Sequence, residues 1–420
     1  MTNSFLNRVH AATLMNDARL DALVLTAPET LRYATGAFPG VATLWRRAGA
    51  ALLVVPADAD AAVTAIVGDL QAEAFRVQSG VADVRAHPLW VETARLSPDA
   101  ASAGDVAERI VHSDRARGRA QDFARPATFS LEASLSLLRD ALNERGLARG
   151  RLGLELGFVA VADFPIFQAA LPHVTWVDCS PVVQRLRAIK SAGEIERLAQ
   201  AAKMSMAGMQ ALFSALEPGQ DADGMTAIWR EAARAKGKAR GWPAPSADWA
   251  YIAVGGDGFA PGGRARAGDL VKIDVGCVVD GYSSDGGRTA VLGPANAAQR
   301  SIYDALRAGF DAGLATLAPG ARFSDIHRTM AQAIRARGLL TYTRGHFGHS
   351  VGASVWSEEW PFISADSEAI VEPGMTLALE TPYYVDGLGG FILEDQFLVT
   401  TRGADPMAEA PRELYEARAR

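Results

Sequence analysis

Residues 270–291 read LVKIDVGCVVDGYSSDGGRTAV, and this stretch decides the fold of the second half of the chain. Hydrophobic residues fill both of its ends, and the turn pair Asp280-Gly281 stands between them, which predicts a β-hairpin. Partners across a hairpin have residue numbers with a constant sum, and the midpoint of Asp274 and Asp285 falls within one residue of the turn. We therefore expect these two carboxylates to lie roughly opposite each other, on one face.

A second pair of acids shows the same arrangement closer to the C-terminus. Glu380 ends the run TLALE and Glu394 lies in the run FILEDQFLV, around a midpoint at Gly387 in a glycine-rich turn. A single acid of this kind is more often a solvated strand residue. Four carboxylates that interrupt hydrophobic strands repel one another and are costly to ionise unless cations offset them. The set therefore predicts a site for divalent metal ions.

A histidine adds a nitrogen ligand to these four acids. His349 stands in GHSVG at residues 348–352, where flanking glycines let the backbone approach a site closely. An isolated histidine is usually a structural residue, but this one has four carboxylate companions. The candidate ligands are Asp274, Asp285, His349, Glu380 and Glu394.

This ordered set and the words around it resemble the pita-bread metallopeptidase family: methionine aminopeptidases, Xaa-Pro aminopeptidases, prolidases and the related creatinases. The matching words are GDLVKIDVG at 268–276, GYSSD at 281–285, Arg288-Thr289, GHSVG at 348–352, EPGM at 372–375 and Glu394-Asp395. The run IKSAGEI at 189–195 also resembles the entry into the first helix of the family's catalytic domain. Within it, Ser191 and Glu194 have the spacing of a capping box.

The resemblance implies an α/β N-terminal creatinase-like domain followed by an α+β pita-bread catalytic domain. We place the first domain at residues 1–185 and the second at residues 186–420. An alternation of helices and strands in the first part agrees with an α/β domain. The expected helices are 8–20, 131–145 and 191–216, and the expected strands are 22–26, 51–55, 151–155 and 174–178. The resemblance further implies a homodimer in which one subunit's N-terminal domain borders its partner's active site.

The resemblance also implies roles for the ligands. Asp285 and Glu394 would bridge two metal ions, Asp274 would complete the coordination of one ion, and His349 and Glu380 that of the other. Glu380 would in addition be the general base or proton shuttle. Two such ions can lower the pKa of a shared water and polarise a substrate carbonyl. The expected activity is therefore hydrolysis of C–N bonds, as in Xaa-Pro peptidases, with Mn²⁺ favoured and Co²⁺ or Zn²⁺ as alternatives.

The substrate side of the site departs from the family pattern. Trp356 stands where family peptidases commonly have a second histidine, and Ile392 stands where they have an arginine. Residues 255–264 also lack the substrate-facing histidine that usually precedes the first aspartate. His346 lies three residues before His349 instead of the usual four, and it is either a catalytic and substrate-binding substitute or a structural histidine. We expect Trp356 to line the pocket and most other aromatics of these segments to be core residues: Trp242, Trp249, Tyr251, Phe259, Trp360 and Phe362.

These departures leave several activities open. A hydrolase of a small non-peptide amide, amidine or aryl-amine is the main alternative to an Xaa-Pro peptidase. A creatinase-like reaction is less favoured, because creatinases lack the metal ligands that this chain retains. A non-catalytic binding module would usually have lost ligands, and lyase chemistry on the same scaffold is a further alternative.

The composition and charge of the chain limit the kinds of molecule that it is expected to bind. The chain has 420 residues, 49% of them hydrophobic, which is enough for two domains. A net charge of -6 and a pI near 5.7 give no electrostatic footprint for nucleic acid or an anionic membrane, so we expect a small-molecule or short-peptide substrate. Cys179 and Cys277 are expected to be buried thiols. With no signal-peptide pattern and no apolar run of membrane length, the expected location is the cytoplasm.

Overall fold

The computed structural model describes residues 4–417 of the chain, apart from residues 93, 95, 97–104, 117, 120–122, 257 and 354–357. Trp356, the expected pocket residue, therefore lies outside the described residues. The chain divides into two compact units, Met1–Leu186 and Arg187–Arg420. Among the helices that the structure describes, none is both long and apolar enough to cross a membrane. Cys179 and Cys277 are buried free thiols, as expected.

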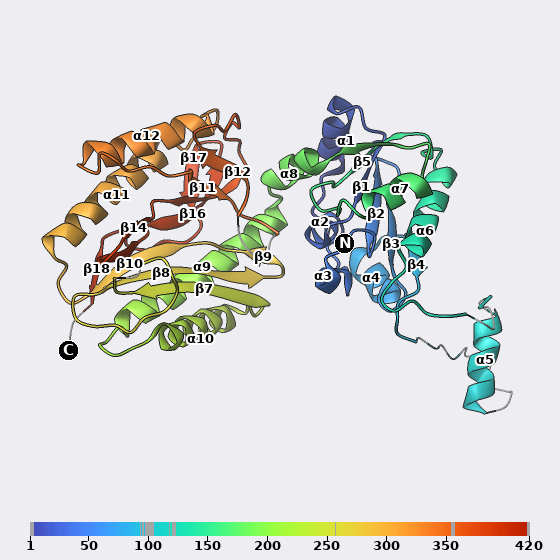
Figure 1. The fold of residues 1–420 in the computed structure, drawn as a ribbon, viewed down its shortest axis with the longest axis horizontal. Coiled ribbons are helices and arrows are strands. Elements are labelled where there is room, and N and C mark those ends of the chain that lie inside the picture. Colours follow the sequence, from blue (N-terminus) through green and yellow to red (C-terminus); the bar gives the residue numbers. More distant parts are fainter. Residues whose placement is uncertain are drawn as a thin grey trace. The chain divides into compact units, whose positions relative to one another are not determined.

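A six-stranded sheet forms the centre of the first unit (Figure 1). Its strands are β1 Ala22–Leu25, β2 Leu52–Pro56, β3 Thr64–Gly68, β4 Asp83–His87, β5 Arg151–Leu154 and β6 Thr175–Asp178. They lie in the order β4-β3-β2-β1-β5-β6, with β1–β2 and β2–β3 antiparallel and the other pairs parallel. Every residue of β1, β2 and β3 is buried, as in strands that are covered on both faces.

Helices alternate with these strands. They are α1 Arg8–Asp17, α2 Pro28–Thr35, α3 Ala42–Trp45, α4 Ala72–Ser79, α5 Val106–Ala116, α6 Leu131–Glu144, α7 Phe164–Ala170 and α8 Ser180–Ala188. Side chains of Asn7 and Ser130 cap α1 and α6 by accepting hydrogen bonds from backbone N–H groups in the first turn. The predicted helices and strands of this unit are confirmed to within three residues at each end.

A larger sheet forms the second unit. Its strands are β7 Ala247–Val254, β8 Leu270–Val279, β9 Tyr282–Ser283, β10 Gly287–Leu292, β11 His346–Ser350, β12 Glu359–Ser364, β13 Thr376–Glu380, β16 Glu394–Thr400, β17 Gly403–Pro406 and β18 Tyr415–Ala417. The main order is β12-β11-β13-β16-β10-β8-β7. Between β13 and β16 the chain forms a separate hairpin of β14 Tyr383–Val385 and β15 Gly389–Phe391.

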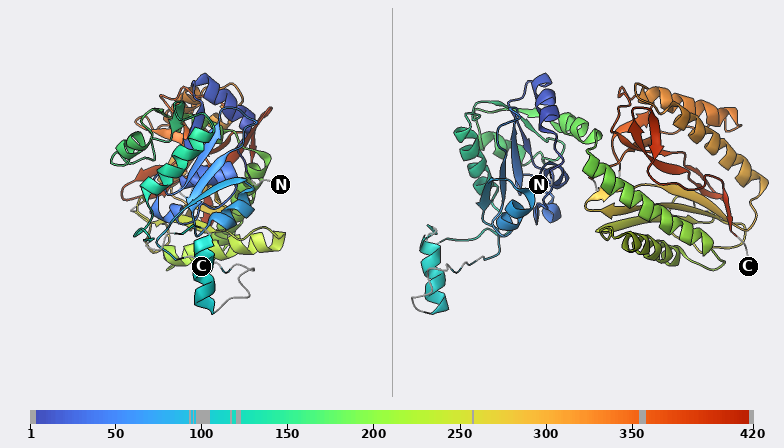
Figure 2. Two further views of the ribbon diagram at one scale, coloured as in Figure 1. Left: turned by 90° about the vertical axis from the view of Figure 1, so that its right-hand side faces the viewer. Right: turned by 180° about the vertical axis from the view of Figure 1, so that it is seen from behind.

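Two helix pairs cover this sheet. They are α9 Ala192–Ser214 with α10 Ala222–Arg240, and α11 Ala297–Thr316 with α12 Phe323–Ala336. The first pair runs along β7 and β8, and the second lies over β11, β12 and β13 (Figures 1 and 2). The capping box of Ser191 and Glu194 at the start of α9 is confirmed.

Each helix pair has its own hydrophobic core. Met204, Trp229 and Ile273 belong to the cluster between α9, α10 and strands β7, β8 and β10. Phe310 and Phe397 belong to the cluster that joins α11 and α12 to the strands from β11 to β16. The two halves of the sheet meet where β10 pairs with β16. The candidate acids, which lie on β8, β13 and β16 and just before β10, are therefore close to this junction.

Candidate metal centre

The first hairpin holds Asp274 on β8 and Asp285 just before β10. Asp280 and Gly281 both have positive φ, 48° and 82°, as a two-residue hairpin turn requires. The register pairs Asp274 with Gly287, so Asp285 lies two residues from the position opposite Asp274. The expectation that the two acids lie roughly opposite each other therefore holds with an offset of two residues, which arises because the turn is centred between Asp280 and Gly281. A shift of two residues keeps the side chain on the same face.

The second hairpin has the predicted register. Glu380 and Glu394 are direct partners across β13 and β16. Glu394 also pairs with Gly287 on β10, and Gly287 pairs with Asp274 on β8. Asp274, Gly287, Glu394 and Glu380 thus form one transverse row across four adjacent strands, and residues in such a row share a face. Gly287 keeps the row open, since a Cβ there would lie 2.6 Å from the Ile392 side chain.

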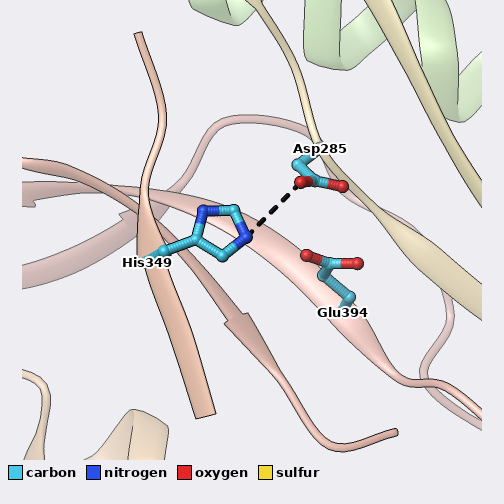
Figure 3. Close-up of side chains that lie close together, drawn as sticks. All are labelled: Asp285, His349 and Glu394. Atoms are coloured by element: carbon cyan, nitrogen blue, oxygen red, sulfur yellow. Dashed lines mark ion pairs between the residues drawn. The ribbon is translucent and has the colours of Figure 1, made fainter. Parts of the chain in front are cut away.

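Three of the candidate ligands form a tight, buried cluster. One ligand atom each of Asp285, His349 and Glu394 lies within 4.8 Å of the others (Figure 3). Nε2 of His349 is 3.5 Å from Oδ2 of Asp285. Nδ1 of His349 lies 3.0 Å from the carbonyl oxygen of Ser350, which fixes the proton on Nδ1 and leaves the Nε2 lone pair toward the carboxylates. A lone pair in that position is favourable when a cation lies between it and the carboxylates.

Gly348 lets β11 lie close to β13. Its φ is 136°, and a Cβ at this position would lie 2.0 Å from the carbonyl oxygen of Ala378. Any larger residue would push β11, and with it His349, away from the site. The close approach that this glycine allows is to the neighbouring strand β13.

The two other acids each contact a basic side chain that the sequence analysis missed. Nζ of Lys272 lies 3.2 Å from Oδ2 of Asp274, and Nη2 of Arg344 lies 2.7 Å from Oε1 of Glu380. Lys272 is two residues before Asp274 on β8, so the period of the strand could have placed it on the same face. Arg344 precedes β11, where no local pattern points to the site.

Burial and mutual repulsion make the acids hard to ionise. Burial raises the pKa of the Glu394 carboxyl well above its usual range, and the charges of Asp285, Glu380 and Asp274 raise it further. Burial also raises the pKa of Asp274, while Lys272 opposes the shift. Such a cluster is short of positive charge. Buried carboxylates together with an imidazole fit divalent cations such as Mn²⁺, Co²⁺ or Zn²⁺.

His346, the first residue of β11, lies beside this cluster. Its Nδ1 is 3.4 Å from Oε1 of Glu380, and its ring centroid is 6.0 Å from that of His349. Burial lowers the pKa of the His346 imidazole, which favours the neutral ring. The structure thus brings His346 to the candidate site, while its role as a substitute for the missing family histidines stays a prediction.

Arg288 fastens the strand that carries Glu394. Its Nη1 donates to the carbonyl oxygen of Glu394 at 2.6 Å, and its Nη2 donates to Oδ1 of Asp395 at 2.6 Å. Nε of Arg412 donates to the second oxygen of Asp395 at 2.7 Å. Arg288 and Asp395 are both buried. The motifs Arg288-Thr289 and Glu394-Asp395 are therefore joined by these contacts, which hold β10 to β16. We call this set of contacts the clamp between β10 and β16.

A second set of hydrogen bonds holds β11 in place. Nζ of the buried Lys190 donates to Oγ of Ser350 at 2.6 Å, and this Oγ donates to the carbonyl oxygen of Thr376 at 3.2 Å. Burial lowers the pKa of Lys190 to about 8. Because the carbonyl group of Ser350 also orients the His349 ring, Lys190 helps to position that ligand through Ser350.

Two aromatic side chains differ from the core placement that we expected. Tyr251 is 46% exposed and Phe259 is 74% exposed. Tyr251 pairs with Asp274 across β7 and β8, so its ring lies beside the row of acids. Phe259 packs edge-on against Tyr384 with 5.3 Å between ring centroids. These rings border the site because the polar row faces the same side of the sheet.

Comparison with known proteins agrees with this architecture. Residues 196–401 match the model of metallopeptidase family M24, and residues 8–189 match the creatinase/prolidase N-terminal domain. An uncharacterized hydrolase/peptidase of Sinorhizobium fredii is 30% identical over 285 residues, which are 66% of this chain and 71% of that protein. The chain belongs to metallopeptidase family M24. The M24 protein is accordingly an enzyme of the hydrolase class.

Other relatives of the M24 protein have named substrates. A Pyrococcus furiosus Xaa-Pro dipeptidase is 30% identical over 238 residues, 56% of this chain and 66% of that protein. An ectoine hydrolase of Halomonas elongata is 28% identical over 302 residues, 66% of this chain and 73% of that protein. The solved structure of a Xaa-Pro dipeptidase from Bacillus anthracis superposes with a TM-score of 0.75 at 19% identity, covering 97% of this chain and 99% of that one. The predicted creatinase-like domain and pita-bread domain are confirmed.

Proposed function

We propose that the M24 protein is a dinuclear metal-dependent hydrolase of C–N bonds that cleaves Xaa-Pro dipeptides. The observation that carries this proposal is the transverse row of Asp274, Glu394 and Glu380, with Asp285 and His349 beside it. Two divalent ions would balance these four carboxylates. The similarity to the Xaa-Pro dipeptidase of Pyrococcus furiosus supports the substrate class.

In this proposal Asp285 and Glu394 would hold both ions, Asp274 would hold one of them, and His349 and Glu380 would hold the other. The ions would supply Lewis-acid polarisation of the substrate carbonyl and a lower pKa for the attacking water. Mn²⁺ is the proposed metal because most of the ligand atoms are carboxylate oxygens, and Co²⁺ and Zn²⁺ are the alternatives.

The chain's own residues would move the proton. Glu380 would accept it from the attacking water on a carboxylate oxygen and deliver it to the leaving nitrogen. His346, 3.4 Å from Oε1 of Glu380, would orient that carboxylate and contact the substrate. Trp356 would line the substrate pocket.

The test begins with protein stripped of metal and reloaded with Mn²⁺, Co²⁺ or Zn²⁺. We expect two ions per chain by elemental analysis, cleavage of glycyl-L-proline, and incorporation of ¹⁸O from labelled water into the glycine product. Asp285→Asn and Glu394→Gln should lose both metal and turnover while keeping the circular dichroism of the folded chain. Turnover by the metal-free protein, or cleavage without the label, would overturn the proposal.

A second candidate is a hydrolase of a small non-peptide C–N bond. The ectoine hydrolase relative favours it, and so does Ile392, which is 1% exposed and places no charge at the position of the family arginine. Ectoine, a cyclic amidine, is therefore assayed beside the dipeptide. Turnover of ectoine alone would replace the first candidate, and binding of metal without any turnover would favour a non-catalytic module.

The proposed assembly is a homodimer, which rests on the family resemblance. Sedimentation velocity of the metal-loaded chain tests it. A single species with the mass of one chain would contradict the proposal.

A further inference from the structure

Arg344 and Lys272 are two basic side chains of the site for which metal binding provides no role. Each pairs with an acid that we expect to hold one ion only: Arg344 with Glu380 at 2.7 Å, and Lys272 with Asp274 at 3.2 Å. The Lys272 side chain is only 4% exposed, and that of Arg344 is 23% exposed. Burying two cations is costly unless their charge is used.

A count of charges shows a surplus. Four carboxylates carry four negative charges, and two divalent ions would offset all four. A hydroxide formed from the attacking water would offset one of the two charges of Arg344 and Lys272, and the other would have no counterpart in the ligand set. A largely buried site with an extra positive charge is complementary to an anionic group on the substrate.

Arg344 has a donor edge available for such a group. Its Nε donates to the carbonyl oxygen of His346 at 2.5 Å, and its Nη2 donates to Glu380. Within the described part of the chain, no residue accepts a hydrogen bond from Nη1. A guanidinium group offers five N–H donors in a planar fork that suits a carboxylate. Two fixed contacts therefore orient Arg344 and leave part of the fork for a ligand.

Aromatic side chains lie next to Lys272. Nζ of Lys272 lies 5.5 Å from the ring centroid of Tyr384, which the β14–β15 hairpin carries, and Phe259 packs against that ring. Tyr384 is 36% exposed. Lys272 therefore lies between the row of acids and aromatic rings that solvent reaches.

We propose that Arg344, supported by the charge of Lys272, binds a carboxylate of the substrate and determines specificity. The substrate class is then small acyl or aminoacyl compounds with a free carboxylate close to the scissile C–N bond. Neutral amides would be poor substrates. This inference rests on the proposed hydrolase function and adds the recognition residue to it.

The test compares glycyl-L-proline with its neutral amide, glycyl-L-prolinamide, on the Mn²⁺-loaded protein. We expect wild type to favour the acid in kcat/KM, and Arg344→Met to lower this preference roughly 10- to 100-fold, the value of a charge-assisted hydrogen bond. Arg344→Lys should keep part of the preference, and Lys272→Met should weaken it. Arg335→Met removes an exposed arginine that donates to the carbonyl oxygen of Tyr342, and it should keep the wild-type ratio.

Metal content is measured for every variant, and if Arg344→Met loses metal, Arg344→Lys carries the comparison. An acid-to-amide ratio that stays at the wild-type value in the Arg344 variants would overturn the inference and leave the hydrolase function intact. If neither compound is cleaved, the proposed function fails, and calorimetric titration of the same two compounds still tests the subsite. Tighter binding of the acid by wild type but not by the variants would support it, whereas equal binding or none would overturn it.

Discussion

Glu380 and Glu394 are direct partners across β13 and β16, so two carboxylates share one buried row. Their repulsion destabilises the metal-free chain. We expect Glu394→Gln to raise the free energy of unfolding of stripped protein by roughly 1 to 3 kcal/mol while abolishing metal binding. Urea unfolding in the presence of a chelator measures this. Glu368→Gln, which changes an exposed acid, is the control and should have no effect; a destabilised Glu394→Gln chain would contradict the argument.

Metal removal should make stability fall with rising pH. Burial raises the pKa of Glu394 in the folded chain well above its ordinary value of 4.5, so the folded state holds a proton that the unfolded state has released. Stability contributed by this group is present below pH 4.5 and is lost as pH rises toward the folded pKa. A divalent ion replaces the proton, and about 2.7 kcal/mol is gained when free metal exceeds its Kd about 100-fold. The melting temperatures of metal-free and metal-loaded protein, measured between about pH 5 and pH 8, should move further apart as the pH rises.

Lys190 should make the stability of the folded chain rise with pH in alkaline solution. Burial lowers its pKa from 10.5 to about 8, so the unfolded chain binds an extra proton between these values and stability rises with pH there. Relative to Lys190→Met, wild type should gain up to about 3 kcal/mol across this window. Urea midpoints of the two proteins, followed through the window, provide the measurement. Lys203→Met, which removes an exposed lysine of α9, should show no such trend.

Arg288→Met should break the clamp between β10 and β16. Among the described residues, the substitution leaves the buried Asp395 with Arg412 as its remaining arginine partner, and we expect a loss of roughly 3 to 5 kcal/mol and weaker metal binding. Arg412→Met removes a side chain that is 24% exposed and keeps the Arg288 contact, so it should cost less. Equal effects of the two substitutions in denaturant unfolding would argue against the clamp.

Gly348→Ala separates a steric clash from backbone strain. The new Cβ would lie 2.0 Å from the carbonyl oxygen of Ala378, and we expect displacement of His349 and loss of metal. Gly338 also has positive φ, 105°, but no atom lies within 4 Å of a Cβ built there. Gly338→Ala should therefore cost only the backbone strain of roughly 1 to 3 kcal/mol and keep metal affinity. Metal titration of both variants distinguishes the two effects.

The two hairpins show where sequence patterns suffice and where they fail. The register of Glu380 and Glu394 could be predicted because the small hairpin between them continues the same pairing, with Tyr383 opposite Phe391. Asp274 and Asp285 lie roughly opposite each other as expected, but with an offset of two residues, because Asp280-Gly281 forms the turn by itself and the numerical midpoint of the two acids lies before it.

Local sequence patterns could not predict contacts between residues that lie far apart in the chain. Lys272 follows strand alternation and could have been inferred, but the contact of Arg344 with Glu380 joins residues 36 positions apart with no shared period. The exposure of Tyr251 and Phe259 also depends on which face of the sheet the polar row occupies. Hydrophobic residues in these segments could equally have packed inward.

The transverse row of Asp274, Gly287, Glu394 and Glu380 makes metal binding a check on strand alignment. A slip of one residue in any of the strands that carry these acids would turn its carboxylate to the opposite face. The misaligned chain would then lack a ligand and gain nothing from the metal. Metal binding would thus stabilise only the alignment of the sheet in which acids from both halves meet, and so favour it over misaligned forms during folding.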